Sequence, residues 1–489
     1  MRDACLVLLL LSSLCGCASE ESPYDLVISG GRVIDPETGL DAIRNVGIRG
    51  DTIIRVSSEP LRGQDTLDAR GLVVAPGFID LHQHVHSPEG YRILALDGVT
   101  TALELETGVP DLQRFIDVRR GQTPIHFGAT ASHWVARLLA WEVPVPPSIN
   151  GPEAGIPAPA AGPVTNEPAS SKQLERIVAE LRNQIELGAL GIGVALEYTP
   201  GATRHEIIKV FELAAEYGVP VFVHVRSAGR TEPGSSIESV AEVIAAAAIT
   251  GAPAHIVHIN SSCLRDSPTC LAMIEGAQKR GLDVTTEAYP YTAAMAVINS
   301  ALFNPGWREK RGIDYSDVEL PETGERLTRE RFEVLHASPE PKLVLIHLNP
   351  DEVVDAIIAN PLVAIASDGL KAHPRGAGTF SRVLARYVRD QGTLTLAEAI
   401  RRITLMPAQR LAAATPDAAR LGRIQEGAQA DIAVFDPRAI QDRATFRAPN
   451  EPSVGMTYLV VAGTVVVNDG QLVEGAVPGR PLVGRRPGT

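Results

Sequence analysis

The middle of the chain, from about residue 76 to residue 421, alternates short apolar runs with longer amphipathic stretches. Several of the longer stretches have the period of an α-helix, at residues 172–187, 204–217, 236–249 and 394–412. The apolar runs predict eight buried strands, at residues 78–82, 99–106, 124–131, 189–196, 219–225, 254–259, 282–288 and 362–367. This alternation predicts an α/β fold, a (β/α)8 TIM barrel, with a doubly wound sheet as the alternative.

Both ends of the chain have a different pattern. Residues 24–75 and 422–489 contain short runs with the period of two that is typical of strands, separated by turns such as Gly30-Gly31 and Asn468-Asp469-Gly470. Strand-rich ends on either side of an α/β middle predict one small β-sandwich built from both termini.

Two segments interrupt the alternation of the middle region. Residues 143–168 are rich in proline, alanine and glycine, and residues 292–341 contain Trp307, Tyr315 and many charges. Because loops of this length in a compact domain are usually functional or disordered, we expect both to be lids over the mouth of the barrel.

The first residues have the pattern of an export signal. Arg2 precedes an apolar stretch, Leu6 to Leu11, which is too short to span a bilayer and is followed by Leu14-Cys15-Gly16-Cys17. This segment resembles a bacterial lipoprotein signal, which implies a signal peptide at 1–17, lipidation of Cys17 and a tether at 18–23. We therefore expect a periplasmic protein, lipid-anchored to the outer membrane. An ordinary cleaved secretory signal is the alternative.

Composition and charge narrow the class of partner. The 489 residues are 45% hydrophobic and 21% charged, which is typical of a globular protein. The net charge of -13 is spread without long acidic or basic blocks, and this disfavours nucleic acid, which needs a clustered basic face. We expect contact with the membrane through the lipid anchor only. The sequence leaves the oligomeric state open.

Export bears on Cys263 and Cys270, because an oxidising compartment lets disulfides persist. The two cysteines flank a short polar segment that contains Pro268, so a local bridge is within reach. We expect a disulfide between Cys263 and Cys270, with two buried free thiols as the alternative.

The candidate chemistry begins at the end of the first barrel strand. His82 and His84 are two residues apart and point to one side of that strand. His224 and His258 end the fifth and sixth strands, and Asp368 follows the eighth. All five lie at carboxyl ends, the face on which barrel active sites assemble, so the pattern predicts a metal site.

Further motifs resemble those of a known family, the N-acyl-D-amino-acid deacylases of the amidohydrolase superfamily. They are Gly77-Phe78-Ile79-Asp80-Leu81-His82-Gln83-His84, Gly98-Val99-Thr100-Thr101, Tyr289-Pro290-Tyr291, Ser367-Asp368-Gly369, His373-Pro374-Arg375 and Met406-Pro407-Ala408. The resemblance extends from about Tyr24 to the end. Residues 103–108 look like the branch called D-glutamate deacylase, whose name implies N-acyl-D-glutamate as substrate.

The resemblance implies a zinc-dependent hydrolase that cleaves the amide bond of small N-acyl amino acids. His82, His84, His224 and His258 match zinc ligands for one or two ions, and Asp368 matches the general acid/base. Within the same superfamily, a metal dipeptidase or a cyclic-amide hydrolase is the alternative. A non-catalytic, surface-tethered binding protein on the same fold is another.

The ligand that bridges two ions departs from the family pattern. Many superfamily members use a strand-4 lysine and D-aminoacylases a strand-2 cysteine, but strand 4 here contains no lysine and the cysteine position falls near Thr107. A hard or borderline cation favours an anionic oxygen in that place, and Glu104 and Glu106 are candidates. Because Glu106 is nearer the strand end, we predict that it bridges. Alternatively, these carboxylates pair with arginine and brace the barrel.

Substrate recognition requires a partner for a carboxylate, which arginine matches bidentately. The resemblance places Tyr198, Arg226, Tyr289 and Arg375 where the substrate would lie. A second carboxylate, as in glutamate, would need another cation, for which His133, Arg137, Lys371 and His373 are candidates. Asn260 stands where D-aminoacylases often have lysine.

Overall fold

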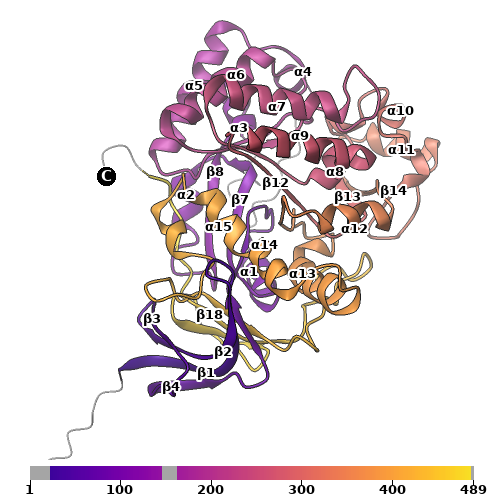
Figure 1. Ribbon diagram of the computed structural model, residues 1–489. Helices are drawn as coiled ribbons and strands as arrows, with labels where there is room; N and C mark the ends of the chain where they lie inside the picture. Colours follow the sequence, from indigo (N-terminus) through magenta and orange to yellow (C-terminus); the bar gives the residue numbers. More distant parts are fainter. Residues whose placement is uncertain (1–22, 146–161, 486–489) are drawn as a thin grey trace, which may run out of the picture.

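The computed structural model describes residues 23–145 and 162–485 (Figure 1). The predicted signal peptide, the predicted lipidation site Cys17 and nearly all of the predicted tether lie outside the described residues, as does most of the segment 143–168. Within the described residues, no helix has both the length and the apolar character needed to cross a bilayer.

Eight strands form one parallel sheet, and their order follows the sequence, which confirms the barrel and excludes the doubly wound alternative. Its members are β6 (Phe78–Asp80), β7 (Val99–Val109), β8 (His126–Ser132), β9 (Ile192–Ala195), β10 (Val221–His224), β11 (Ala254–Ile256), β12 (Val284–Ala288) and β16 (Val363–Ile365). Gln83 pairs with Gly369 and joins the first strand to the last beyond their ends, which nearly closes the barrel.

Helices surround the barrel (Figure 1). They are α1 (Pro88–Leu96), α2 (Leu112–Asp117), α3 (His133–Ala140), α4 (Pro163–Asn166), α5 (Ser171–Glu186), α6 (Arg204–Tyr217), α7 (Ser236–Thr250), α8 (Ile259–Cys263), α9 (Ser267–Lys279), α12 (Asp351–Ala359), α13 (Arg375–Arg382), α14 (Leu396–Ile403) and α15 (Leu405–Leu411). Shorter turns are the 3-10 helices Leu264–Asp266 and Pro416–Arg420 and the π-helix Val383–Asp390.

The predicted helix 394–412 is in fact two helices, α14 and α15, which meet at Thr404. Pro407 cannot donate a backbone hydrogen bond to the preceding turn, and its ring crowds the carbonyl there. The Thr404 hydroxyl donates instead to the carbonyl of Ile400 at 2.7 Å. The helix therefore breaks one turn before the proline.

The two ends of the chain meet in a second, nine-stranded sheet (Figure 1). Its strands are β1 (Tyr24–Asp35), β2 (Leu40–Arg49), β3 (Thr52–Ser57), β4 (Gly63–Asp68), β5 (Val73–Pro76), β17 (Ile432–Phe435), β18 (Met456–Val461), β19 (Thr464–Asn468) and β20 (Gln471–Leu472). Strand β5 pairs with β1 on one side and with β17 on the other, so the N- and C-terminal parts share one sheet and one apolar core.

The segment 292–341 is an ordered unit with its own small core. It contains β13 (Ala293–Val297), the 3-10 helices Ala301–Phe303 and Tyr315–Asp317, α10 (Trp307–Arg311), β14 (Val318–Glu319) and α11 (Arg329–His336). Strands β13 and β14 pair with the following β15 (Leu343–His347). Trp307 stacks on Phe332 with ring centroids 5.2 Å apart. This unit contributes side chains to the cavity described below.

Candidate metal centre

The closing seam of the barrel brings the first histidine pair to Asp368. Backbone hydrogen bonds join His84 N to Gly369 O (3.1 Å) and Gly369 N to His82 O (3.2 Å). Below them, the buried carboxylate of Asp80 accepts from the amide of Ser367 at 3.0 Å and from its hydroxyl at 2.5 Å. Two segments nearly 290 residues apart in the chain are thereby fixed against each other.

Glu106 lies between two pairs of histidines. Its Oε2 is 3.2 Å from Nε2 of both His82 and His84. Its Oε1 is 2.6 Å from His224 Nδ1 and 3.0 Å from His258 Nε2. Because each carboxylate oxygen faces a different pair, Glu106 has the position of a bridging ligand.

Position 106 requires a close approach from the neighbouring strand. A Cβ atom on Gly193 of β9 would lie 2.4 Å from the carbonyl oxygen of Glu106. Glycine is therefore needed at 193 to let β9 pack against the irregular end of β7.

Asp368 completes the cluster from the eighth strand. Its Oδ1 is 3.5 Å from His82 Nε2 and 3.4 Å from His84 Nε2, and its Oδ2 is 2.8 Å from Nη2 of Arg375. Burial alone would raise the pKa of this carboxyl, but Arg375 and the histidines outweigh burial and lower the pKa. The group is thus a carboxylate.

His258 and Asp368 both have left-handed backbone conformations, with φ of 33° and 48°. Such conformations are unfavourable for residues other than glycine, and they occur preferentially at functional sites. At positions 258 and 368, this conformation turns the side chain inward at the end of its strand.

Each histidine is also held through its other ring nitrogen, at a distance between 2.6 and 3.2 Å. The partners are Glu287 for His82, Glu104 for His84, Glu197 for His224 and Ser262 for His258. Such contacts fix the tautomer and the orientation of a metal-binding imidazole. His255 in turn contacts Glu287 at 3.1 Å.

The charges around the cluster favour a cation. Burial lowers the pKa of His82, but Asp368, Glu106 and Glu287 outweigh burial and raise it to about 10. Burial would raise the pKa of Glu287, but attraction to His82 and hydrogen bonding to His255 and His82 lower it to about 2. A buried place that stabilises positive charge so strongly suits a metal ion.

The donor set fits a divalent metal of the zinc type. Three overlapping groups of three ligand atoms lie within 4.8 Å: His82, His84 and Glu106; His82, His258 and Asp368; Glu106, His224 and His258. Imidazole nitrogens with one or two carboxylate oxygens are common zinc ligands. All members are buried.

Glu104 and Glu106, the two carboxylates of β7, have different roles. Glu104 accepts from the amide and the hydroxyl of Thr107 at 3.2 and 3.0 Å, while its other oxygen holds His84 at 2.7 Å. Among the described residues, Glu104 and Glu106 pair with histidines and not with an arginine, which argues against the bracing alternative. Thr107 supports Glu104 through these two hydrogen bonds.

Three of the four residues that the resemblance places at the substrate lie beside the cluster. Tyr198 lines the cavity next to the metal ligands, with its ring 5.1 Å from that of His224. Arg375 is only 1% exposed, and its guanidinium lies 4.5 Å from the ring of Tyr289. This places Arg375 and Tyr289 together behind Asp368.

The structure does not bring Arg226 and His373 to the cavity. Arg226 donates to both oxygens of Glu242 at 2.7 to 3.2 Å, because α7 presents that carboxylate beside the loop after β10. His373 is fully buried, where it donates to Ala293 O and its Nδ1 accepts from the amide of Arg375. His373 therefore positions the loop that carries Arg375.

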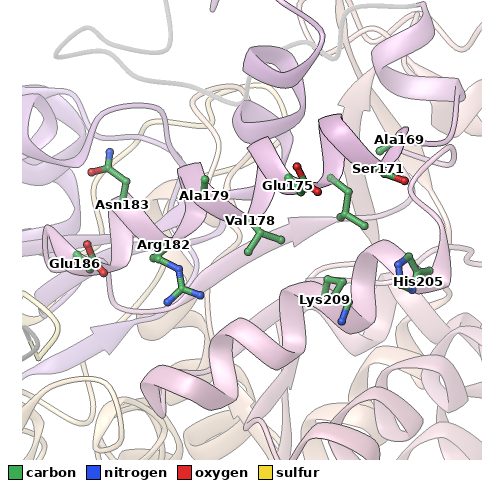
Figure 2. Close-up of a pocket in the computed structure, with 11 residues that line it drawn as sticks. Ala169, Ser171, Glu175, Val178, Ala179, Arg182, Asn183, Glu186, His205 and Lys209 are labelled. Carbon is green, nitrogen blue, oxygen red and sulfur yellow. The ribbon is translucent and has the colours of Figure 1, made fainter.

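The other predicted cations also have different surroundings. His133 and Arg137 converge on the buried carboxylate of Glu206, at 2.8 and 2.7 Å, and this ion pair joins α3 to α6. Lys371 is exposed. A separate hollow between α5 and α6, lined by Val178, Arg182 and Lys209 among others, also lies away from the metal ligands (Figure 2).

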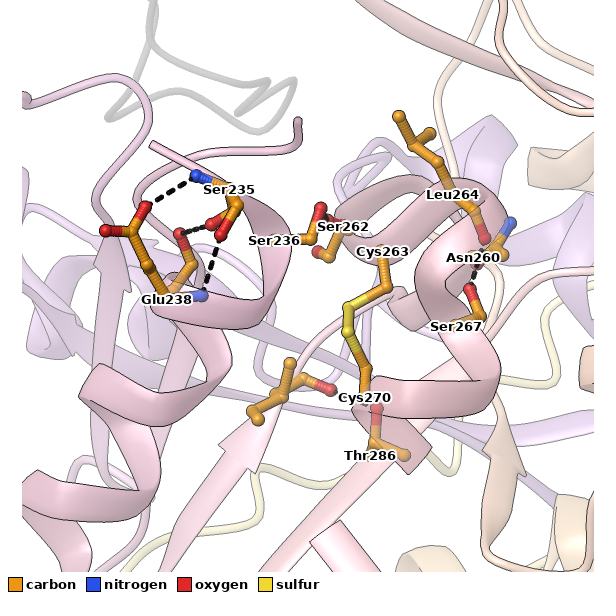
Figure 3. The surroundings of a disulfide bond; sticks show 12 residues. Ser235, Ser236, Glu238, Asn260, Ser262, Cys263, Leu264, Ser267, Cys270 and Thr286 are labelled. Carbon is orange, nitrogen blue, oxygen red and sulfur yellow. Dashed lines mark hydrogen bonds between the residues drawn. A yellow bond between two sulfur atoms is a disulfide. The ribbon is translucent and has the colours of Figure 1, made fainter. Parts of the chain in front are cut away.

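Cys263 and Cys270 form a disulfide that spans the end of α8 and the start of α9 (Figure 3). Ser262, next to Cys263, holds His258 Nδ1, and its carbonyl accepts from the hydroxyl of Ser236 at 2.8 Å. Ser267 donates to the carbonyl of Leu264 at 2.6 Å. The disulfide thus closes the loop that follows a metal-binding histidine.

Replacement of both cysteines by serine should destabilise this loop. Closing so short a loop stabilises the folded chain by about 2–3 kcal/mol relative to the open one. We expect a lower midpoint of denaturant unfolding and faster loss of metal to a chelator, because Ser262 then holds His258 less firmly. Unchanged unfolding and unchanged metal release in the double variant would contradict this.

Sequence reasoning missed Glu287, Glu197 and Arg311. Glu287 had a usable signal, because it is a carboxylate near the carboxyl end of a predicted buried strand. Glu197 and Arg311 had none. Glu197 follows β9, Arg311 ends the short helix α10, and they meet only in the folded chain.

Comparison with known proteins places these features in one family. A model of the amidohydrolase family matches residues 173–467. The chain is 30% identical to N-acyl-D-glutamate deacylase from Alcaligenes xylosoxydans xylosoxydans, over 91% of this chain and 94% of the relative, and 28% identical to D-aminoacylase from the same organism, over 95% and 98%.

A solved structure shares the whole architecture. It is N-acyl-D-glutamate deacylase from Bordetella bronchiseptica complexed with zinc and a phosphonate inhibitor that mimics the tetrahedral intermediate. The TM-score is 0.78 at 25% identity, over 95% of this chain and 100% of that one. The barrel, the sheet from both termini, the histidine cluster and these matches together show that the chain belongs to the amidohydrolase family.

Proposed function

We propose that this protein is a zinc-dependent hydrolase of N-acyl-D-amino acids. The observation that carries the proposal is Glu106 between two histidine pairs, with Asp368 beside both ligands of the first pair. The relatives support the substrate class, since they are named for the deacylation of N-acyl-D-glutamate and as D-aminoacylase.

The zinc would be held by His82, His84, His224, His258 and Glu106. Glu106 offers one oxygen to each histidine pair, which supports a pair of ions. Bound zinc supplies Lewis acidity to water and to the scissile carbonyl, so that attack proceeds at neutral pH. The protein orients the imidazoles through Glu287, Glu104, Glu197 and Ser262.

Asp368 moves the proton. Its Oδ1 faces the ligands while Oδ2 is fixed by Arg375, so one oxygen is free to take a proton from the attacking water. The water oxygen bonds to the carbonyl carbon, the carbon–nitrogen bond breaks, and Asp368 gives that proton to the departing amine. The products are a carboxylic acid and a free amino acid.

Arg375 recognises the carboxylate of the substrate. Its guanidinium is buried, and its Nε and Nη1 have no hydrogen-bond partner among the described residues. Unpaired donors on a buried charge are costly, and an oxygen of the substrate carboxylate would accept from one of them. The guanidinium lies over the ring of Tyr289. Tyr198 lines the cavity beside the candidate metal ligands.

The test is metal analysis combined with a substrate panel. The purified protein should contain one to two equivalents of zinc, lose activity on chelation and regain it when zinc is added. With zinc bound, it should hydrolyse N-acetyl-D-leucine or N-acetyl-D-methionine faster than the L-enantiomers, dipeptides or cyclic amides. Zinc-loaded protein that hydrolyses none of the acylated amino acids would refute the proposal.

We further propose that the chain is exported and anchored to the outer membrane through Cys17. The sequence Leu14-Cys15-Gly16-Cys17 supports this, and a disulfide is in keeping with an oxidising compartment. In a Gram-negative host, the protein should fractionate with membranes, and Cys17→Ala should release it from them. A wild-type protein that still carries its first 16 residues after purification would contradict lipidation of Cys17.

A further inference from the structure

A cavity adjoins the metal ligands, and its walls differ sharply in character. Its floor contains Glu106, His224, His258 and Asp368. Its apolar lining residues are Ala294, Met295 and Leu302 of the segment 292–341, Ile346 of β15, and Leu348, which directly follows β15. A substrate bound at the metal centre therefore places its substituents against aliphatic side chains.

Among the described residues that line this cavity, Arg311 is the one lysine or arginine, and it is already engaged. Its Nη2 is paired with Glu197, and its Nη1 donates to the carbonyl of Leu302 at 2.9 Å. The side chain is 6% exposed, so this charge is neutralised within the protein. Arg311 is not available to a second carboxylate.

Other positions near the cavity add no cation. Asn260 donates to the carbonyl of Tyr289 at 3.3 Å and presents an uncharged amide. Arg226 is occupied by Glu242.

We infer that this cavity selects N-acyl amino acids whose only charge is the α-carboxylate and whose side chain is apolar, and that it rejects glutamate and aspartate. The inference rests on the proposed function, in which Arg375 takes the α-carboxylate. It sets this chain apart from its relative that acts on N-acyl-D-glutamate, with which it shares 30% identity.

The physical reason is the cost of an unpaired buried charge. A γ-carboxylate in this cavity loses water and gains no partner, whereas a leucine or methionine side chain gains apolar contact. We expect kcat/KM for N-acetyl-D-leucine to exceed that for N-acetyl-D-glutamate by about 100-fold or more. N-acetyl-D-glutamine, which has the same shape without the charge, should be hydrolysed about 10-fold faster than the glutamate derivative.

The experiment measures kcat/KM of the zinc-loaded full-length protein for these three substrates. The inference is supported if kcat/KM is highest for N-acetyl-D-leucine, lower for N-acetyl-D-glutamine and lowest for N-acetyl-D-glutamate. A value for N-acetyl-D-glutamate equal to or above that for N-acetyl-D-leucine overturns it and leaves the proposed function intact. Hydrolysis of none of the three overturns both.

A variant tests the apolar wall directly. Leu348→Arg places a cation in the cavity and should raise the ratio of glutamate to leucine kcat/KM at least 10-fold. Leu343→Arg is the matched control, because Leu343 begins β15 whereas Leu348 directly follows it, and Leu343 is also half-buried and does not line the cavity. A ratio that is unchanged in Leu348→Arg, or changed equally in the control, would overturn the assignment of selectivity to this wall.

Discussion

Glu106→Gln should lower zinc affinity and activity by at least about 100-fold. The substitution removes the negative charge whose two oxygens contact the two histidine pairs, and an amide nitrogen would replace one of the two ligand oxygens. Zinc content after dialysis and kcat/KM in the presence of excess zinc are the measurements.

Glu104→Gln is the matched control on the same strand. Its carboxylate holds His84 from behind and contacts Thr107, so the amide keeps one of these contacts and loses another. Loss of such a supporting contact typically costs about 10-fold or somewhat more in metal affinity. If Glu104→Gln were the more damaging change, or if Glu106→Gln retained full zinc, the bridging role would be wrong.

Asp368→Asn should lower kcat by roughly 10²- to 10⁴-fold, with little change in KM. Asparagine can accept from Arg375 but cannot take a proton from water. It also tolerates the left-handed backbone of position 368, where φ is 48°, so the fold and the zinc content should be kept. Alanine at this position would remove the carboxylate and also strain the left-handed backbone, so a loss of activity could not be assigned to either effect.

Asp469→Asn provides a control with the same substitution and nearly the same backbone. Asp469 has a φ of 49° and lies in an exposed turn of the terminal sheet. Near-normal kcat in Asp368→Asn would remove Asp368 from the mechanism. A large fall in melting temperature in that variant alone would show that its ion pair with Arg375 serves folding first.

The positions of the residues in the cluster show which of them can be predicted from the sequence. His82, His84, His224 and His258 end predicted strands, and parallel strands in a barrel bring their carboxyl ends to one face. Glu106 followed from chemistry, since the lysine and cysteine of related bridges are missing and a carboxylate lies near the strand end. Strand assignment therefore predicted that the four histidines lie at one face of the barrel, and the choice of Glu106 also required an argument from metal chemistry.

Arg226 shows where this reasoning fails. Its position two residues after His224 suggested a substrate contact, but the direction of a long side chain in a loop depends on its neighbours. Glu242 on α7 lies close enough to pair with it at 2.7 Å. Nothing in the local pattern of either segment indicates that contact.

The sequence by itself determined the order of strands and helices, the face on which the ligands gather and the types of atom that could hold a metal. These properties depend on periodicity, on strand direction and on the chemistry of side chains, all of which are local. Tertiary structure decided that Glu106 and not Glu104 faces both pairs, that Glu287 and Glu197 orient the histidines, and that Arg311 is neutralised inside the cavity. Those contacts join side chains up to 205 residues apart, and only the packing of separate elements sets distances of that kind.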